Sequence, residues 1–170
     1  MIYRDATPSD GPAVDTMSRR SWIETFRHSC SPADLALYLA EAYGPEGALM
    51  RDFRDPAIHF HLAVEGDSVA GYAKLGDSYL HAGLAPPGTL QLMQIYVASG
   101  WHGKGVAHAL MDWATASARD RGANALVLTV WEGNDRALAF YRRLGFAHIG
   151  DYAFKTGTQI DRDLVLRLTL

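Results

Sequence analysis

The stretch Val97-Ala98-Ser99-Gly100-Trp101-His102-Gly103-Lys104-Gly105-Val106-Ala107 decides the fold of this chain. It follows an apolar run at 90–97 and leads into a long helical pattern. A strand, a glycine-rich turn and a helix start bring successive backbone N–H groups together at the positive end of the helix dipole. Gly103 and Gly105 have no Cβ, so the backbone can approach an anion closely. The sequence therefore predicts a turn that binds a phosphate or pyrophosphate.

The usual nucleotide-binding motifs do not fit this turn. A mononucleotide P-loop needs Ser or Thr after its lysine, and here Gly105 follows Lys104. A dinucleotide fingerprint needs a third glycine where His108 stands, and the apolar run 125–130 offers no acidic residue at the expected spacing. A nucleotide-binding protein is therefore disfavoured.

A second motif lies about thirty positions later, as Asn134-Asp135-Arg136-Ala137-Leu138-Ala139-Phe140-Tyr141-Arg142-Arg143-Leu144-Gly145-Phe146. It is typical of a short capped helix, with Asn134 as N-cap and Gly145 just after the C-terminus. Asn134 and Tyr141 are two turns apart, so both side chains can point toward one ligand.

With both motifs in hand, the chain resembles the GNAT superfamily of N-acetyltransferases. The family's pyrophosphate loop, [QR]-x-x-G-x-[GA], corresponds to 102–107, with His102 in the Gln/Arg place. The later pattern N-x-x-A-x-x-[FL]-Y-x-x-x-G-F is matched throughout 134–146. The resemblance is firm over 90–151, and the order of elements extends it to nearly the whole chain. Locally, 130–134 and 158–170 also look like the PaiA-type polyamine acetyltransferases.

The resemblance implies an α/β (α+β) fold in a single domain, 1–170. The GNAT-like sheet would be mixed and mostly antiparallel, with helices on both faces and the strands 90–97 and 125–131 splayed apart at the acetyl-CoA site. Hydrophobic periodicity predicts the individual elements. The expected strands are 2–5, 59–65, 68–75, 90–97, 125–131, 146–152 and 163–168, and the expected helices are 11–27, 32–43, 46–55, 106–122 and 134–145.

The resemblance also implies an enzyme that transfers the acetyl group of acetyl-CoA to a primary amine, with a polyamine or another small cationic amine as the candidate acceptor. The residues expected to bind acetyl-CoA are Ile95, Tyr96, Val97, His102, Gly103, Lys104, Gly105, Val106, Ala107, Asn134 and Tyr141. Lys104 could instead be a solvated surface lysine, and Asn134 could act only as an N-cap.

Tyr141 is the expected general acid, which would protonate the departing thiolate. The alternative is a packed aromatic of its helix. A rival hypothesis is an acetyl-CoA-binding regulatory or sensor module without catalysis; the lack of a carboxylate on the strand 90–97 supports it, and Tyr141 argues against it.

The general base is not evident from the sequence. An alkylammonium has a pKa of about 10.4 and must lose a proton before it attacks. Family members often place a carboxylate on the strand 90–97, but Gln91, Met93 and Gln94 are not basic. Either the base lies elsewhere, with Glu24, Asp77 and Glu132 as candidates, or a chain of water molecules carries the proton away. The residues expected to bind the acceptor are Trp22, Glu24, Tyr38, Asp77 and Glu132, although the aromatic residues among them would also suit a helix core.

Composition narrows the class of protein. The chain has 170 residues, 48% hydrophobic and 21% charged, which suits an ordinary globular domain. A net charge of −3 gives no basic field for nucleic acid. No apolar run reaches membrane-spanning length, and the N-terminus has no signal-peptide layout. Cys30 is the only cysteine, so we expect a cytoplasmic protein. We expect it to be a monomer or a homodimer. His59 and His61 lack a third partner, so no metal site is expected.

Overall fold

A seven-stranded sheet organises the computed structural model, which describes residues 1–170. The strands follow the order β1-β2-β3-β4-β5-β7-β6, and every neighbouring pair is antiparallel except β4 and β5. Their bounds are β1 Ile2–Asp5, β2 His59–Glu65, β3 Ser68–Asp77, β4 Thr89–Val97, β5 Ala125–Trp131, β6 Ala147–Thr156 and β7 Gln159–Thr169. The predicted mixed, mostly antiparallel sheet is confirmed.

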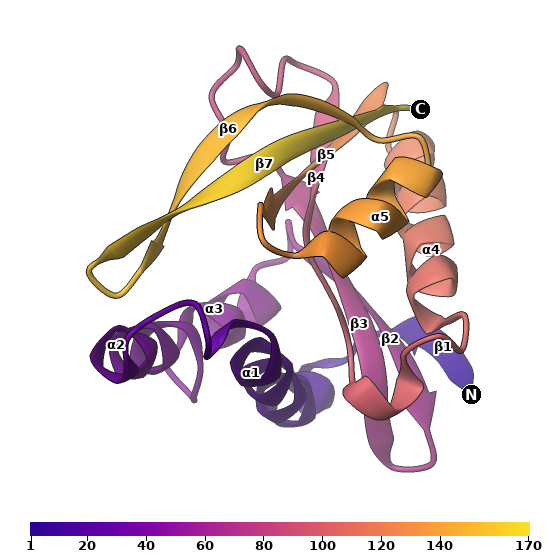
Figure 1. Cartoon of the computed structure of the whole chain (residues 1–170). Coiled ribbons are helices and arrows are strands. Elements are labelled where there is room, and N and C mark those ends of the chain that lie inside the picture. Colours follow the sequence, from indigo (N-terminus) through magenta and orange to yellow (C-terminus); the bar gives the residue numbers. More distant parts are fainter.

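Five helices cover the two faces of this sheet (Figure 1). Their bounds are α1 Gly11–Phe26, α2 Pro32–Ala42, α3 Ala48–Arg54, α4 Val106–Asp120 and α5 Asp135–Arg143. The first three pack on one face, and α4 and α5 pack on the other. None of the helices combines the length and the apolar character needed to cross a bilayer.

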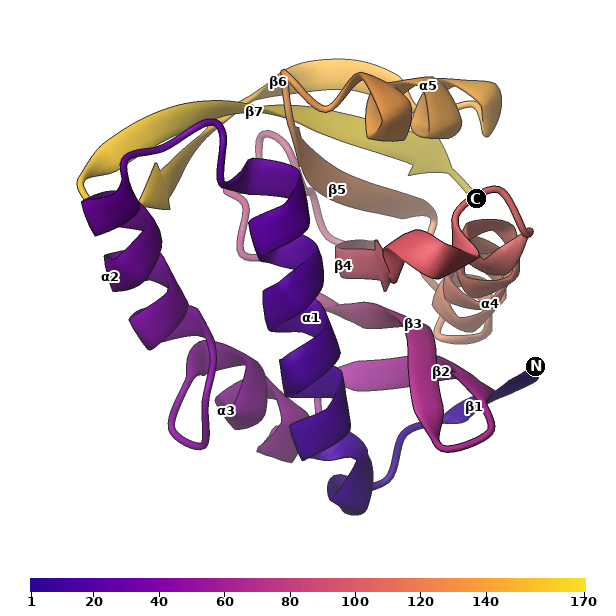
Figure 2. The ribbon, with the colours of Figure 1, turned by 60° about the horizontal axis from the view of Figure 1, so that its bottom comes forward.

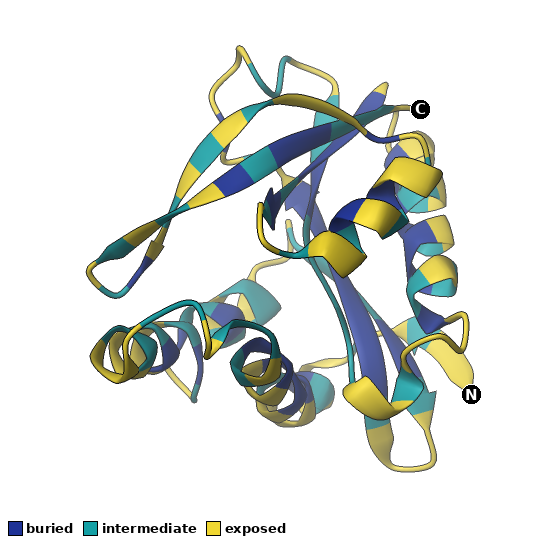
Figure 3. Ribbon diagram, in the orientation of Figure 1, coloured by how far each residue is buried: buried dark blue, intermediate teal, exposed yellow.

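Strand β3 shows how one sequence serves both faces. Because side chains alternate along a strand, Ala73 and Leu75 pack in the core beneath α4, whereas Tyr72 and Lys74 face α1 and α3. The Tyr72 hydroxyl lies 2.8 Å from Ser18 Oγ of α1, and Lys74 Nζ lies 2.6 Å from Asp52 Oδ2 of α3. Figure 3 shows this central part of the sheet as almost continuously buried. Strand β3 therefore contributes side chains to the hydrophobic cores on both faces of the sheet.

The parallel pair β4 and β5 separates soon after it begins. Thr89–Gln91 pair with Ala125–Val127, and no pairing continues beyond that point. A bulge at Met93 shifts the β3–β4 register, since Leu75 pairs with Leu92 and Lys74 with Gln94. The second halves of β4 and β5 therefore present free edges toward each other, as the predicted splay requires.

The β6–β7 hairpin is longer than the predicted strands 146–152 and 163–168. It extends to a turn at Gly157, where φ is +61°, and reaches across to α2 (Figures 1 and 2). At its tip the backbone N and Oγ1 of Thr158 donate to Asp34 Oδ1 at 2.6 and 2.7 Å. The extension was missed because polar residues occupy both faces of this part of the hairpin, which weakens the alternation that marks a strand.

Candidate active site

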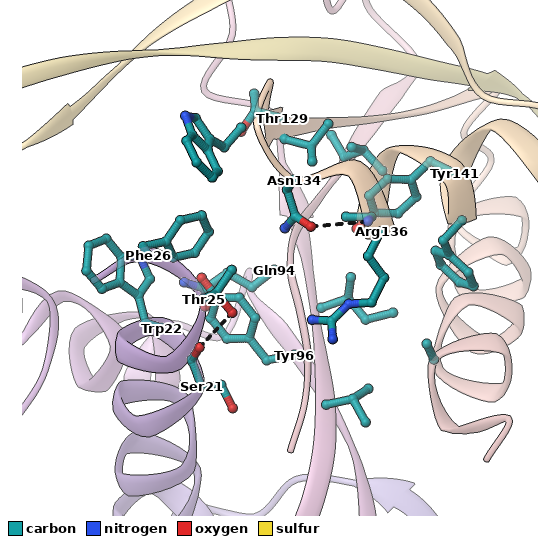
Figure 4. A pocket seen from close by; sticks show the side chains of 18 of the residues that line it. Ser21, Trp22, Thr25, Phe26, Gln94, Tyr96, Thr129, Asn134, Arg136 and Tyr141 are labelled. Atoms are coloured by element: carbon teal, nitrogen blue, oxygen red, sulfur yellow. Dashed lines mark hydrogen bonds between the residues drawn. The ribbon is translucent and has the colours of Figure 1, made fainter. Parts of the chain in front are cut away.

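A cleft of about 940 Å³ opens where β4 and β5 separate. Its walls come from α1, α2, the segment 99–108, α5 and the β6–β7 hairpin. Figure 4 shows Trp22 and Phe26 of α1 on one side, Asn134 and Tyr141 near α5 on the other, and Tyr96 of β4 between them. The cleft thus connects the two faces of the sheet.

The free edge of β4 offers backbone donors to the cleft. Ala98 N donates to Ala70 O of β3 at 2.9 Å, so its N–H points away from the cleft. Because successive N–H groups of a strand point to opposite sides, those of Ile95 and Val97 point into the cleft. Both residues are among those that the family resemblance implies for acetyl-CoA binding.

The turn between β4 and α4 forms an anion cradle. Gly103 and Gly105 have φ values of +74° and +81°, in the left-handed region that favours glycine. The amides of His102 and Lys104 donate to Ser99 and Trp101 carbonyls. The amides that donate to no protein acceptor are those of Gly103, Gly105, Val106, Ala107 and His108. A Cβ built on Gly105 meets nothing within 4 Å, so this glycine faces open space.

His102 joins the cradle to two neighbouring elements. Its Nε2 lies 2.8 Å from Val97 O, and its Nδ1 lies 2.8 Å from Arg136 Nη1 of α5. A carbonyl oxygen can only accept a hydrogen bond, and a guanidinium can only donate one. These contacts therefore require a neutral imidazole that carries its proton on Nε2. Lys104 does not line the cleft, since its Nζ lies over the Trp101 ring at 4.7 Å from the centroid.

Asn134 and Tyr141 both line the cleft from the side of α5. Asn134 Oδ1 accepts from Ala137 N at 3.2 Å, which is the N-cap contact, and Asn134 Nδ2 has no protein acceptor. The Tyr141 side chain is 7% exposed and packs edge-on against Phe146. Its hydroxyl makes no hydrogen bond within the protein, and burial raises the pKa of Tyr141 well above the usual value.

The opposite side of the cleft is an aromatic box. Trp22 of α1 stacks on Tyr38 of α2 at 4.2 Å, and Tyr38 lies 5.8 Å from Phe154 of β6. Phe26 meets Trp131 of β5 at 5.9 Å. Trp22 and Tyr38 are therefore brought together in the cleft. The aromatic side chains of the sheet, Trp131 and Phe154, face these helices, and Thr129 lies on the same face of β5 as Trp131.

Two carboxylates of β7, Asp161 and Asp163, lie in this box, and neither was among the predicted residues. Asp161 accepts from Thr156 Oγ1 at 3.0 Å and from Gln159 Nε2 at 2.6 Å. Asp163 is only 6% exposed. The spacing of two residues, which places both on one face of a strand, could have indicated them had the strand been extended to Gln159.

The predicted acidic residues lie elsewhere. Glu24 reaches the rim of the cleft but is half-exposed and accepts from Arg20 Nε at 3.0 Å. Asp77 is exposed at the end of β3 and does not line the cleft. Glu132 points outward, where its carboxylate pairs with Arg162 at 3.0 Å.

Comparison with known proteins decides the family. The profile of the Acetyltransferase (GNAT) family matches residues 16–146. This chain belongs to the GNAT acetyltransferase family. It is an acyltransferase that uses acetyl-CoA, and the free edge of β4 with its unpaired cradle amides fits such a co-substrate.

Relatives in sequence and structure agree with this assignment. The enzyme is 34% identical to streptothricin acetyltransferase of Streptomyces lavendulae, with 99% of this chain and 93% of that protein covered. It is 29% identical to an uncharacterized N-acetyltransferase of Lactobacillus delbrueckii subsp. lactis, over 95% and 92% of the two chains. The PaiA N-acetyltransferase of Thermoplasma acidophilum, solved with coenzyme A, shares the fold at a TM-score of 0.77 and 17% identity, over 99% and 98% of the two chains.

Proposed function

We propose that this enzyme acetylates a primary amine of a small cationic molecule, such as a polyamine, by direct attack of the amine on acetyl-CoA. The observation that carries the proposal is the aromatic box with Asp161 and Asp163 on the acceptor side of the cleft. Aromatic faces and buried carboxylates together favour an alkylammonium over a neutral or anionic ligand. The likeness to streptothricin acetyltransferase, whose name states its acceptor, is a further reason to test basic amines.

The donor side has the groups that acetyl-CoA requires. Acetyl-CoA supplies the acetyl group as a thioester whose carbonyl carbon is open to attack by an amine. The N–H groups of Ile95 and Val97 would hold the acyl arm and polarise the carbonyl, and the amides of 103–108 would hold the pyrophosphate. Asn134 Nδ2 would add a donor to the arm.

Tyr141 acts as the general acid in this proposal. Its hydroxyl has no protein partner, and the raised pKa keeps it protonated in the neutral range. It would give this proton to the sulfur as the C–S bond breaks. Tyr141 can also be a packed aromatic residue of its helix, because packing of the ring would hold the hydroxyl at the cleft.

An amine panel with free-thiol detection tests the proposal. The panel contains spermidine, a diamine, streptothricin, a neutral-tailed monoamine and a peptide with a free N-terminus. We expect kcat/KM for the cationic amines to exceed that for the neutral-tailed monoamine by roughly tenfold or more, as one cation–π or charge contact provides. Equal rates, activity on the peptide alone, or acetyl-CoA binding without thiol release on any amine would contradict the proposal.

A further inference from the structure

The proposed reaction needs a proton acceptor on the acceptor side of the cleft. An alkylammonium nitrogen has no free electron pair until it loses a proton. Strand β4 offers Gln91, Met93 and Gln94 near its bulge, and none of these accepts a proton. Glu24 is already paired with Arg20 at the rim.

We propose that Asp163 is the general base that takes this proton from the acceptor ammonium. The inference rests on the proposed function, since it concerns an amine bound in the aromatic box. Asp163 pairs with Trp131 across β5–β7 and with Tyr152 across β6–β7, so the three side chains share the face that looks toward α1 and α2. Its carboxylate is therefore on the acceptor side, opposite the face on which Tyr141 packs.

Two hydroxyl groups lie near the carboxylate. The Thr129 hydroxyl on β5 lowers the pKa of the Asp163 carboxyl, and the Tyr79 hydroxyl lies 3.3 Å from Thr129 Oγ1. Thr129 and Asp163 both line the cleft. Asp163 forms no salt bridge, so no cation neutralises its carboxylate.

The electrostatic surroundings suit a base that works near neutral pH. The pKa of Asp163 is raised to about 7, mainly by burial; the Thr129 hydroxyl lowers it, and the charge of Asp161 adds to the rise. The titratable groups that face it are Tyr38 from α2, Tyr79 from the segment after β3, Tyr152 from β6 and Asp161 from its own strand. A base with this pKa is a far better proton acceptor than an ordinary aspartate.

The protons balance with two groups. Asp163 takes one proton from the ammonium, and the neutral nitrogen attacks the thioester carbonyl carbon. The N–C bond forms, the C–S bond breaks, and the sulfur takes a proton from Tyr141. The nitrogen then loses a second proton, which reprotonates Tyr141, and Asp163 releases its proton to water. The products are the amide and the free thiol, with one proton released.

The test compares pH profiles of kcat/KM for Asp163→Asn and the unaltered enzyme, with spermidine as acceptor and saturating acetyl-CoA. In the unaltered enzyme kcat/KM should rise through about pH 7 to a plateau, because ionised Asp163 accepts the proton. In Asp163→Asn only free amine reacts, so kcat/KM should climb about tenfold per pH unit toward the amine pKa near 10.4. At pH 7.5 the loss should be about 100-fold or more.

Two further variants separate a base from a merely structural residue. Thr129→Val removes the hydroxyl that lowers the pKa of Asp163, so the rise of kcat/KM should move to higher pH while the plateau remains. Asp151→Asn is the matched control, because it removes an exposed carboxylate of the same hairpin that pairs with Arg162 outside the cleft. Its pH profile should match that of the unaltered enzyme. Melting temperature and acetyl-CoA affinity check that each variant is folded.

The outcomes distinguish this inference from the proposed function. A folded Asp163→Asn enzyme that keeps the plateau near pH 7 overturns the base but leaves cationic-amine acetylation in place. If Asp163→Asn does not fold, an unmoved profile in Thr129→Val overturns it. An unaltered enzyme that acetylates no amine of the panel overturns both.

Discussion

Tyr141 combines two properties that a buried tyrosine seldom has together. Its ring packs among Leu138, Phe140 and Phe146, yet its hydroxyl makes no hydrogen bond within the protein. Because Tyr141 lines the cleft, this hydroxyl is available to hydrogen-bond a ligand there. Asn134, two helical turns before Tyr141, also has one polar atom without a protein partner. Its Oδ1 accepts the N-cap hydrogen bond, and its Nδ2 has no acceptor in the protein.

Replacing Tyr141 by Phe isolates the hydroxyl from the ring. We expect kcat to fall by about 100-fold or more, because the general acid is lost. The acetyl-CoA dissociation constant should change little, since the proton transfer matters in the transition state. Steady-state rates and calorimetric titration of acetyl-CoA provide the two readouts. A near-normal kcat would mean that water or another group protonates the sulfur.

Gly105 tests the anion cradle at a single backbone position. Valine there must adopt a φ of +81°, and its branched side chain would fill the open space beside the free amides. We expect Gly105→Val to weaken acetyl-CoA binding at least tenfold, measured by calorimetry. Gly100→Ala is the control, because Gly100 also faces open space but has no positive φ. Unchanged affinity in a folded Gly105→Val protein would place the pyrophosphate elsewhere.

At the scale of elements, the β6–β7 hairpin closes the acceptor side. Its tip is held to α2 by Asp34, which accepts from Thr158, and to the end of α1 by Gln159 Nε2, which donates to Ser29 O at 2.8 Å. These contacts fix the part of the hairpin in which Phe154 packs 5.8 Å from Tyr38 and Asp161 lines the cleft.

Releasing the hairpin tip should therefore affect the acceptor more than the donor. For Asp34→Ala we expect the acceptor KM to rise roughly three- to tenfold, as the loss of one hydrogen-bonded group allows, with acetyl-CoA affinity unchanged. The turn variant Asp67→Ala is the control, because Asp67 lies between β2 and β3, outside the cleft. Equal acceptor KM values for both variants would show that the tip contact does not shape the box.

The same contact carries a pH signature. Hydrogen bonds from Thr158 and Ser31 lower the pKa of Asp34 to about 2, below the value of about 3.9 in an unfolded chain. A lowered pKa stabilises the fold above the unfolded value and loses that contribution as pH falls toward the folded one. The difference in Tm between the unaltered protein and Asp34→Ala should therefore shrink from about pH 4 to pH 2. If this difference in Tm stays constant from pH 4 to pH 2, the ionised carboxylate of Asp34 is not the source of the stabilisation.

Helix α3 packs on the sheet through Leu49 and Phe53 and through one buried ion pair. The side chain of Lys74 is 8% exposed, and its ammonium pairs with Asp52 of α3. Asp52→Ala leaves that ammonium buried without its partner, which should cost about 2–4 kcal/mol of unfolding free energy. Denaturant unfolding measures this cost. The double variant Asp52→Ala/Lys74→Met should recover most of it, and an equally unstable double variant would contradict the ion-pair explanation.

Local motifs and long-range pairings differ in how far the sequence reveals them. The cradle at 102–107 and the helix with Asn134 and Tyr141 depend on neighbours within a few residues, so spacing alone located them. Asp163 becomes a site residue only because β7 lies between β5 and β6, where burial and Thr129 act on it. The exposed positions of Asp77 and Glu132 likewise depend on where strands end and which arginine lies nearby. Their residue types suited a base, but only the three-dimensional arrangement excludes them from the cleft.

At the scale of the whole molecule, the cleft connects the two faces of the sheet through the opening between β4 and β5. The cradle and α5 lie with the core that packs under α4, whereas the aromatic box lies on the face of α1 and α2. In the proposed reaction the donor would enter from the first side and the acceptor from the second, so both substrates would bind at once.

Direct transfer has a kinetic consequence that a covalent acyl-enzyme would not share. The single cysteine, Cys30, does not line the cleft, and burial raises the pKa of its thiol, so it is a poor nucleophile. Initial rates at varied acetyl-CoA and amine should give intersecting double-reciprocal lines, because both substrates must be bound before the N–C bond forms. Cys30→Ser should retain the rate, since its thiol takes no part. Parallel lines, together with protein-bound acetyl label in the absence of amine, would instead indicate a ping-pong route. That result would require a nucleophile in the cleft and would remove the need for Asp163 to act on the amine while the donor is bound.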